Sequence, residues 1–270
     1  MIVINSKKKL TEYLSHNTNK YAFIPTMGNL HAGHTSLIHT AKKYSKHIIV
    51  SIFVNPTQFS ATEDFSTYPR TQKVDIQLLE QENIDIAYIP AMEDIYPIPS
   101  TIWLDIPHLT NILCGKSRPH FFNGVMTVLL KLFFQINPYF VILGEKDYQQ
   151  YLIVHEMVAS IGIDTQVISS PIIRNQNGLA LSSRNTKLHN VKQAEEINKI
   201  LFEYAKTIKT KEDLESCKNK LLIVVDELDY LEIRHKSDLT KFQNNMNLKE
   251  YRLFFAGKIN GVRLIDNIAL

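Results

Sequence analysis

The chain has 270 residues, of which 44% are hydrophobic and 21% charged, and its formal net charge is +3. This size suits one large hydrophobic core or two unequal ones. The small charge gives no reason to expect nucleic acid or a membrane as the main partner. Residues 1–10 lack the apolar segment of a signal peptide, and Lys7–Lys9 is expected to be a solvated helix face. Because Cys114 and Cys217 show no metal or redox spacing, we expect a cytoplasmic protein without disulfides.

The first strongly patterned segment combines a buried strand, a tight turn and a helix. Residues 21–24 are apolar, and Pro25 cannot donate to a β-ladder, so the strand is expected to stop there. Gly28 supplies a permissive turn. A helix is expected from near Gly33, because apolar residues recur at helical spacing between positions 37 and 41.

This segment has the pattern of an anion site. A helix that follows a strand and a turn presents free backbone N–H groups and the positive end of its dipole to a phosphate. His31 and His34 are three residues apart, so within one helical turn they share a face, and each imidazole could donate a hydrogen bond to a phosphoryl oxygen. Histidines near a helix start also act as caps or surface residues. Two at this spacing could be half of a metal site, although no third ligand of obvious spacing follows.

A second apolar run, residues 47–54, is too short for a helix and is typical of a central parallel strand. Ligands in open α/β sheets bind beyond the carboxyl ends of strands. Asn55 and Gln58 therefore lie where side-chain amides could orient a small polar substrate. Asn-Pro also opens turns, so a purely structural role for Asn55 stays open.

Helices and strands then alternate along the chain. Residues 64–71 are expected to form a loop that leads to a helix with apolar positions at 74, 76, 78 and 79. Residues 84–90 are expected to form a strand, and 92–97 a loop. This alternation predicts a doubly wound parallel sheet with right-handed crossovers.

The middle of the chain contains two weaker candidates. Residues 115–117 are Gly-Lys-Ser, but the earlier glycine and the preceding strand of a P-loop are missing. Residues 123–125 open an apolar helix, on which Val125 and Met126 could either line a pocket or pack in the core.

Residues 138–143 form another apolar run, which ends in the string Gly-Glu-Lys-Asp-Tyr-Gln-Gln. Gly144 would let the backbone approach a nucleotide, Lys146 could place a charge on a phosphate, and Asp147 could accept from a ribose hydroxyl. Gln150 could meet the same substrate as the earlier glutamine if the following helix has begun. Lys-Asp at a helix start is also common for capping and solvation alone.

The last third of the chain is expected to close the sheet and cross to a second domain. Ser182–Arg184 offers two hydroxyls and a guanidinium that suit β- and γ-phosphates, although such residues also fill ordinary turns. The composition then becomes more charged. We expect helices at 193–206 and 211–225, strands at 228–233 and 251–256, and a closing segment at 261–267.

These strings, in order, resemble the pantothenate synthetase family. Residues 25–34 resemble that family's His-x-Gly-His signature, which is related to the adenylate-forming motif of nucleotidylyltransferases and class I aminoacyl-tRNA synthetases. Residues 53–59, 144–150 and 263–267 match the family as well, and Ser182–Arg184 is similar to its counterpart of the loop that closes over the triphosphate. The resemblance covers essentially the whole chain.

The resemblance implies an α/β fold, with a Rossmann-like doubly wound parallel sheet over residues 1–174 and a smaller α+β lid domain over residues 175–270. It implies ATP-dependent condensation of (R)-pantoate with β-alanine through pantoyl adenylate, releasing AMP and pyrophosphate. Mg²⁺ would bind through the ATP phosphates with no metal ligands from the protein, and the enzyme would be a homodimer. The implied catalytic residues are His34, His31 and Lys146. The implied ATP-binding residues are Met27, His31, Gly33, His34, Gly144, Lys146, Asp147, Ile173, Leu181, Ser182, Ser183 and Arg184. The implied pantoate-binding residues are Pro25, Thr26, Met27, Asn55, Gln58, Val125 and Gln150.

The chain departs from the family pattern at three positions. Phe121 stands where a histidine is usual, Asn123 where an arginine is common, and Asn177 where an aspartate is usual. Other functions therefore stay open. One is a different nucleotidylyltransferase on the same fold, and another is a nucleotide-binding protein that has lost activity. A third is a metal-dependent hydrolase that uses His31 and His34, which stoichiometric zinc would reveal.

Overall fold

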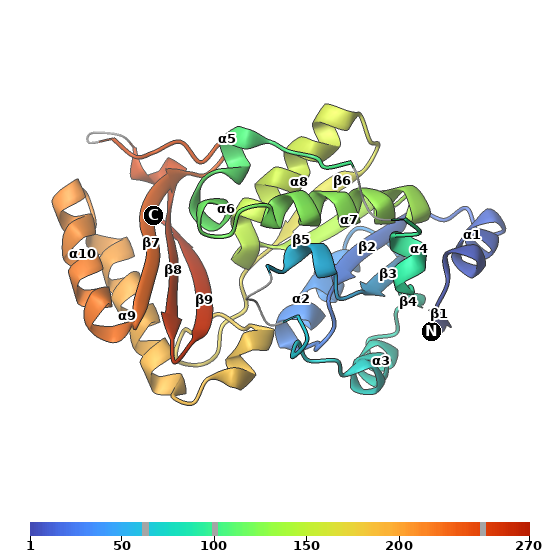
Figure 1. Ribbon diagram of the computed structural model, residues 1–270, viewed down its shortest axis with the longest axis horizontal. Helices are drawn as coiled ribbons and strands as arrows, with labels where there is room; N and C mark the ends of the chain where they lie inside the picture. Colours follow the sequence, from blue (N-terminus) through green and yellow to red (C-terminus); the bar gives the residue numbers. More distant parts are fainter. Residues whose placement is uncertain (61–64, 99–101, 244–246) are drawn as a thin grey trace. The chain divides into compact units, whose positions relative to one another are not determined.

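The computed structural model describes residues 1–60, 65–98, 102–243 and 247–270 (Figure 1). Asp64, the first residue of the expected loop, lies outside the described residues. The chain divides into two compact units. Unit 1 contains residues 1–145 and 153–171, and unit 2 contains residues 146–152 and 172–270.

Unit 1 is built on a six-stranded parallel sheet in the order β1-β4-β3-β2-β5-β6, so the predicted α/β fold is confirmed. Its strands are β1 (Ile2–Ile4), β2 (Tyr21–Thr26), β3 (His47–Ile52), β4 (Ile86–Tyr88), β5 (Phe140–Gly144) and β6 (Gln166–Ser170). Its α-helices are α1 (Lys7–Ser15), α2 (Ala32–Ala41), α3 (Gln72–Gln81), α4 (Met92–Ile95), α5 (Pro107–Thr110), α6 (Leu113–Ser117) and α7 (Phe121–Ile136), and α8 (Tyr148–Ile161) begins in unit 2 and ends in unit 1. The exposed run Lys7–Lys9 opens α1, as expected.

The order of the strands reverses between β2 and β5. From β2 the chain winds outward through β3 and β4, whereas β5 and β6 continue the sheet on the other side. Such a switch point leaves a crevice at the carboxyl ends of the two adjacent strands, where ligands bind in open α/β sheets. The predicted Pro25–His34 segment begins in the last two residues of β2, and Gly144 ends β5, so both lie at this point.

Two local predictions were wrong. Strand β2 continues through Pro25 to Thr26. Thr26 O accepts from Phe53 N on the β3 side. Because neighbouring residues of a strand point their backbone groups to opposite sides, the N–H that Pro25 lacks would face β5. The pairing of β5 with β2 covers only Ala22 and Phe23, so no ladder hydrogen bond is lost at Pro25. Residues 92–95 form helix α4 rather than a loop, because the Asp94 side chain accepts from Ala91 N at 3.0 Å and caps this short turn.

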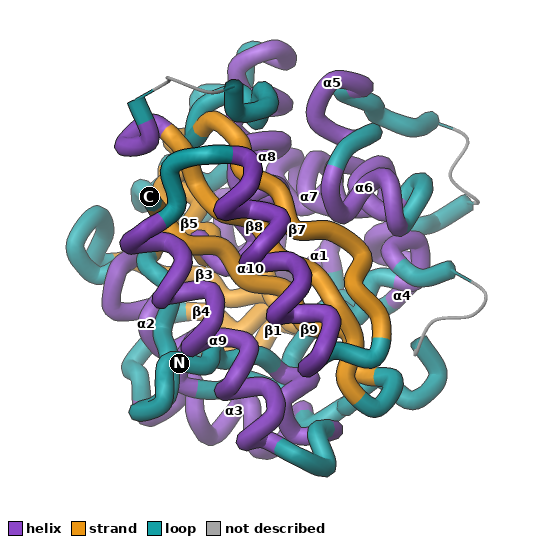
Figure 2. Tube along the Cα trace, turned by 90° about the vertical axis from the view of Figure 1, so that its left-hand side faces the viewer, coloured by secondary structure: helices purple, strands orange, loops and turns teal. Residues whose placement is uncertain are grey.

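Unit 2 contains a three-stranded antiparallel sheet in the order β7-β8-β9. Helices α9 (Val191–Thr207) and α10 (Lys211–Val224) cover one face of it (Figures 1 and 2). The strands are β7 (Glu227–His235), β8 (Tyr251–Ile259) and β9 (Val262–Ala269). Buried residues from these helices and strands form a separate hydrophobic core. None of the helices in the described parts of the chain is long and apolar enough to span a membrane.

Candidate active site

The turn after β2 is held by a buried carboxylate from α3. Gly28 has a φ of +79°, and a Cβ there would lie 3.0 Å from Asp75 Oδ2 and 3.1 Å from Ile52 Cγ2, so the turn requires glycine. Asp75, which is 2% exposed, accepts from Asn29 N at 3.0 Å and Leu30 N at 2.8 Å. Thr71 Oγ1 also donates to both oxygens of this carboxylate. The backbone that leads to His31 is therefore fixed by α3.

The two histidines cap the helix that they introduce. His31 is the N-cap of α2, and its Nδ1 accepts from Gly33 N at 3.0 Å. His34 Nδ1 accepts from His31 N at 3.2 Å, and the two ring centroids are 4.2 Å apart. Because each Nδ1 accepts a backbone N–H, each neutral ring carries its proton on Nε2. The paired rings can therefore present two Nε2–H donors.

The expectation of free backbone N–H groups at this helix start is wrong for four of them. Gly33 N and His31 N donate to the imidazoles, while His34 N and Thr35 N both donate to His31 O, at 2.7 and 3.1 Å. The capping role of the histidines and a ligand-facing role are thus compatible. The backbone donors hold the rings at Nδ1, and the proton of each neutral ring is then on Nε2.

A second polar group lies after β3. Asn55 is 1% exposed, and its Nδ2 donates to Gln58 Oε1 at 3.0 Å and to Gly124 O at 3.2 Å. Its Oδ1 accepts from Tyr96 OH at 2.9 Å and from Thr57 Oγ1 at 3.0 Å. Burial raises the pKa of Tyr96, so its phenol stays protonated and donates. The Asn55 amide is occupied by protein partners, and its contact with Gln58 Oε1 fixes which end of the Gln58 amide is the oxygen and which is the NH₂ donor.

Helix α7 supports the same turn from its N-terminus. A Cβ on Gly124 would lie 2.3 Å from Thr57 O, so the helix and the 3₁₀ turn η1 (Pro56–Gln58) touch backbone to backbone. Arg118 Nη2 donates to Gln58 O at 3.0 Å, and its guanidinium stacks 3.7 Å from the centre of the Phe121 ring. Phe121, one of the departures from the family pattern, thus orients an arginine that holds the Gln58 turn.

Asn123 and the weaker candidates in α6 and α7 are accounted for locally. Asn123 Nδ2 donates to Leu104 O at 2.6 Å. Val125 and Met126 are 2% and 0% exposed within α7. The Gly-Lys-Ser string lies in α6, where a Cβ on Gly115 would lie 1.7 Å from Thr110 O, which agrees with the rejection of a P-loop there.

The remaining unit 1 candidates sit at the ends of β2 and β5. Thr26 Oγ1 donates to Ser51 O at 2.7 Å and accepts from Gly28 N at 3.2 Å, which anchors Pro25 and Met27 on either side. A Cβ on Gly144 would meet only Leu37 Cδ2, at 3.7 Å. Internal packing therefore does not require glycine at this position.

Unit 2 holds the other predicted residues. Lys146 and Asp147 lie in the 3₁₀ turn η2 (Glu145–Asp147), and Asp147 is exposed. Gln150 lies in the first turn of α8, so the helix has begun by this residue, which was the condition for its predicted role. Ile173 and Leu181 face each other across a hairpin in which Leu181 N donates to Ile173 O at 2.9 Å. Ser182 Oγ accepts from Arg184 N at 3.3 Å and caps the 3₁₀ turn η3 (Ser183–Lys187).

The predicted residues thus fall into two sets. The residues from Pro25 to Gly144 belong to unit 1, and Lys146, Asp147, Gln150 and the residues from Ile173 to Arg184 belong to unit 2. Unit 1 brings the turn, the histidines and the switch point together, and unit 2 brings the Lys146 segment and the hairpin to one strand, β9. Among the described residues, no three His, Cys, Asp or Glu side chains gather as metal ligands would.

Sequence reasoning missed the residues that hold these groups in place. They are Asp75, Tyr96 and Arg118, and both Asp266 and Asn267 were noted only as part of a matching string. One signal was present for Asp75: a carboxylate between the apolar positions of α3 implies a buried partner. Nothing local identified that partner, because Asn29 is 46 residues away.

The parallel sheet with its switch point and the capped histidine pair define an α/β protein of the Rossmann-like class. A family model described as pantoate-beta-alanine ligase matches residues 2–269. The pantothenate synthetase of Fervidobacterium nodosum is 38% identical over 275 residues, covering 99% of this chain and 97% of the relative. That of Anaplasma marginale is 37% identical, covering 100% of each chain. This chain belongs to the pantoate–β-alanine ligase, or pantothenate synthetase, family, and is a ligase.

Solved structures agree with this assignment. The crystal structure of pantothenate synthetase from Thermus thermophilus has a TM-score of 0.94 at 33% identity, covering 100% of this chain and 99% of that one. The pantoate-beta-alanine ligase of Francisella tularensis, complexed with beta-gamma ATP and beta-alanine, has a TM-score of 0.87 at 37% identity, covering 100% and 97%.

Proposed function

We propose that this enzyme joins (R)-pantoate and β-alanine at the expense of ATP, through a pantoyl adenylate. Family membership supports the overall reaction, and the Francisella relative was crystallised with an ATP compound and β-alanine. The observation that carries the adenylate step is the pair of histidines at the sheet switch point, whose Nδ1 atoms are held by backbone N–H groups.

The chemistry requires activation, because the oxide of a carboxylate is a poor leaving group. A pantoate carboxylate oxygen attacks the α-phosphorus of ATP, and the bond to the β-phosphate oxygen breaks and releases pyrophosphate. The β-alanine amine then forms the amide bond at the acyl carbon, AMP leaves, and the amine loses its proton. Neither step needs a covalent protein nucleophile. Positioning two bound reactants can contribute about 7–11 kcal/mol in favourable cases.

In unit 1, we assign His31 and His34 to the phosphates. Their Nε2–H donors would stabilise the charge that grows on the α-phosphate and on the leaving pyrophosphate. Gln58 would donate to a pantoate oxygen, and Asn55 would hold its amide in that orientation. Gly144 would let the nucleotide lie close to the backbone at the end of β5. The proposed contacts also include Met27 and Gly33 for ATP, and Pro25, Thr26, Met27 and Val125 for pantoate.

In unit 2, we assign the charged and hydroxyl groups to the nucleotide. Lys146 would place its ammonium at the α-phosphate, and Asp147 would accept from the ribose. Ser182, Ser183 and Arg184 would hold the β- and γ-phosphates. These donors suit phosphate oxygens rather than a bare cation, and Mg²⁺ would arrive on the triphosphate and neutralise part of its charge. The proposed contacts also include Ile173 and Leu181 for ATP, and Gln150 for pantoate.

We also propose the roles of the two domains, the location of the enzyme and its oligomeric state. Residues 1–174 would carry ATP and pantoate binding, and residues 175–270 would act as the lid. The enzyme would be a cytoplasmic homodimer.

The test is pyrophosphate release from Mg-ATP and pantoate, with and without β-alanine, while AMP is followed. We expect a pantoate-dependent burst near one pyrophosphate per site, which becomes steady AMP and pantothenate production when β-alanine is added. A protein that binds ATP but releases no pyrophosphate under either condition would contradict the proposal. It would favour a different acceptor or a nucleotide-binding protein without activity.

A further inference from the structure

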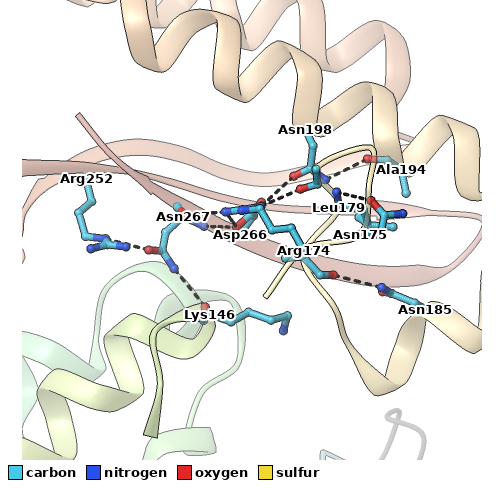
Figure 3. Close-up of polar contacts among 12 residues, drawn as sticks. Lys146, Arg174, Asn175, Leu179, Asn185, Ala194, Asn198, Arg252, Asp266 and Asn267 are labelled. Carbon is cyan, nitrogen blue, oxygen red and sulfur yellow. Dashed lines mark hydrogen bonds and ion pairs between the residues drawn. The ribbon is translucent and has the colours of Figure 1, made fainter. Parts of the chain in front are cut away.

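A buried asparagine in the last strand contacts the backbone of the Lys146 segment. Asn267 is 2% exposed, and its Nδ2 donates to Lys146 O at 3.2 Å (Figure 3). The Lys146 side chain runs away from this contact. Asn267 therefore holds the backbone from which the lysine side chain projects and leaves the ammonium to other partners.

The orientation of the Asn267 amide is fixed by an arginine of the neighbouring strand. Arg252 Nε donates to Asn267 Oδ1 at 2.8 Å, so the oxygen is taken and Nδ2 must face Lys146 O. The same guanidinium stacks 4.1 Å from the centre of the Tyr148 ring. Tyr148 OH donates in turn to Lys236 O at 3.0 Å. Residues 146–148 are thus attached to β8, to β9 and to the residue that follows β7.

The residue before Asn267 holds the second predicted phosphate segment. Asp266 receives Arg174 Nη1 and Nη2 at 2.6 and 2.8 Å, and both side chains are largely buried. Arg174 also donates to Gly178 O at 3.0 Å, and Asn185 Nδ2 donates to Ala180 O at 3.1 Å (Figure 3). This bidentate pair therefore fixes the hairpin that leads to Ser182–Arg184.

We propose that Asn267 is a positioning residue for adenylate formation, which sets Lys146 relative to the Ser182–Arg184 turn through the backbone carbonyl of Lys146. Two adjacent residues of β9 carry this arrangement: Asp266 fixes the hairpin, and Asn267 fixes the lysine segment. The inference rests on the proposed function for its chemistry, since it assigns Lys146 to the α-phosphate. The attachment itself is a property of the protein without substrate.

The first experiment tests the attachment by amide hydrogen exchange on the full chain without ligands. Asn267→Asp keeps the size of the side chain and an oxygen for Arg252, but cannot donate to Lys146 O. We expect faster exchange across residues 145–152 in this variant, with unchanged exchange in β3. Arg263→Met is the matched control. Arg263 lies in β9, as Asn267 does, and the substitution removes its largely buried ion pair with Asp229 of β7. Equal exchange of residues 145–152 in wild type and Asn267→Asp would overturn the proposal.

The second experiment tests whether Asn267 acts through Lys146. Asn267→Asp should lower the rate of pantoate-dependent pyrophosphate release about 10- to 100-fold, the scale of a misplaced catalytic group. In a Lys146→Ala background, measured by single turnover at high enzyme concentration, the same substitution should lower the rate less than about twofold, because the group that it positions is gone. Full additivity of the two losses would show a merely structural role and overturn the proposal.

The failure of this inference and that of the proposed function can be told apart. If wild type releases no pyrophosphate, the proposed function fails, and the exchange of residues 145–152 still decides whether Asn267 holds them. If wild type is active and Asn267→Asp does not fold, Asn267→Ser replaces it in both experiments. Activity of Asn267→Ser equal to that of Arg263→Met would then count against the proposal.

Discussion

In the proposed mechanism, the Nδ1 and Nε2 atoms of the His34 imidazole have different roles, and amide side chains can separate the two. His34→Asn places an amide oxygen near the Nδ1 position, where it can still accept from His31 N, but nothing replaces Nε2–H. We expect this variant to keep wild-type stability and lose about 2–4 kcal/mol of transition-state stabilisation, measured as kcat/KM for pyrophosphate release. His34→Gln reaches the Nε2 position and should retain more activity. Equal losses in the two variants, or near-normal adenylation by His34→Asn, would contradict the role given to Nε2.

The Gln58 amide has a fixed orientation, because its Oε1 accepts from Asn55 Nδ2, and its Nε2 is the proposed donor to pantoate. Gln58→Ala should raise the KM for pantoate much more than the KM for ATP. Tyr96→Phe removes one donor to Asn55 Oδ1 while Thr57 Oγ1 remains, so the same selective effect should appear in smaller size. Steady-state kinetics with each substrate varied in turn measures both, with Gln81→Ala on the exposed face of α3 as the control. Equal effects on the two KM values would make Gln58 structural.

Local pattern singled out the proposed site residues one by one, whereas it did not identify the residues that support them. Histidine, glutamine and lysine stand at the ends of strands, where local pattern alone points to a ligand. Asp75 and Tyr96 act on residues that are 46 and 41 positions away, and such pairings exist only once the sheet has formed. The same limit applies to Phe121, because no pattern of apolar residues predicts its contact with Arg118.

At the level of elements, α3 matters to the site through one residue of its buried face. Asp75→Asn replaces an acceptor oxygen with an NH₂ group that must face a backbone N–H of the turn. We expect a loss of about 1–3 kcal/mol in the free energy of unfolding, which is the cost of leaving a buried donor without a hydrogen bond. We also expect slower pyrophosphate release. Glu80→Gln makes the same chemical change at an exposed position of α3 and should alter neither. Urea unfolding of wild type, Asp75→Asn and Glu80→Gln measures these stabilities. Wild-type stability in Asp75→Asn would show that the turn is held without this carboxylate.

Long apolar runs predicted the central strands well, whereas a short helix and the end of one strand were not predicted. Strand β3 was predictable because Ile48–Ile52 is buried continuously and no other element of that length suits such a run. Helix α4 is a single turn fixed by the Asp94 cap, and the continuation of β2 through Pro25 depends on where pairing with β5 ends. The extension of β2 is a consequence of tertiary pairing, whereas α4 depends on a local cap in an element too short to show periodicity.

For the molecule as a whole, the grouping of the chain into two units was the least accessible property from sequence. Lys146–Leu152 follows β5 directly, so chain order favours its inclusion with the parallel sheet. It groups instead with unit 2, because Lys146 O and the Tyr148 side chain contact β8, β9 and Lys236. The proposed catalytic lysine and the proposed catalytic histidines thus belong to different units.

The core of unit 2 contains Cys217, which gives that unit a pH dependence that can be measured. Cys217 is 0% exposed, and burial raises the pKa of its thiol from 9.0 to about 12. The folded thiol therefore stays neutral while the unfolded thiol ionises, so its contribution to stability is complete below about pH 9 and is lost as the pH rises toward 12. Between pH 8 and pH 10.5, this should lower the free energy of unfolding by about 2 kcal/mol.

Cys217→Ala removes that contribution, so its free energy of unfolding should fall by about 2 kcal/mol less than that of wild type over the same pH interval. Urea unfolding followed by circular dichroism at pH 8 and pH 10.5 measures the difference, and comparison within one variant cancels the packing lost with the sulfur atom. Cys114→Ala, a buried cysteine of unit 1, is the matched control. Identical pH dependence in wild type and Cys217→Ala would mean that the thiol ionises as readily in the folded core as in the unfolded chain, and that the core of unit 2 admits water around α10.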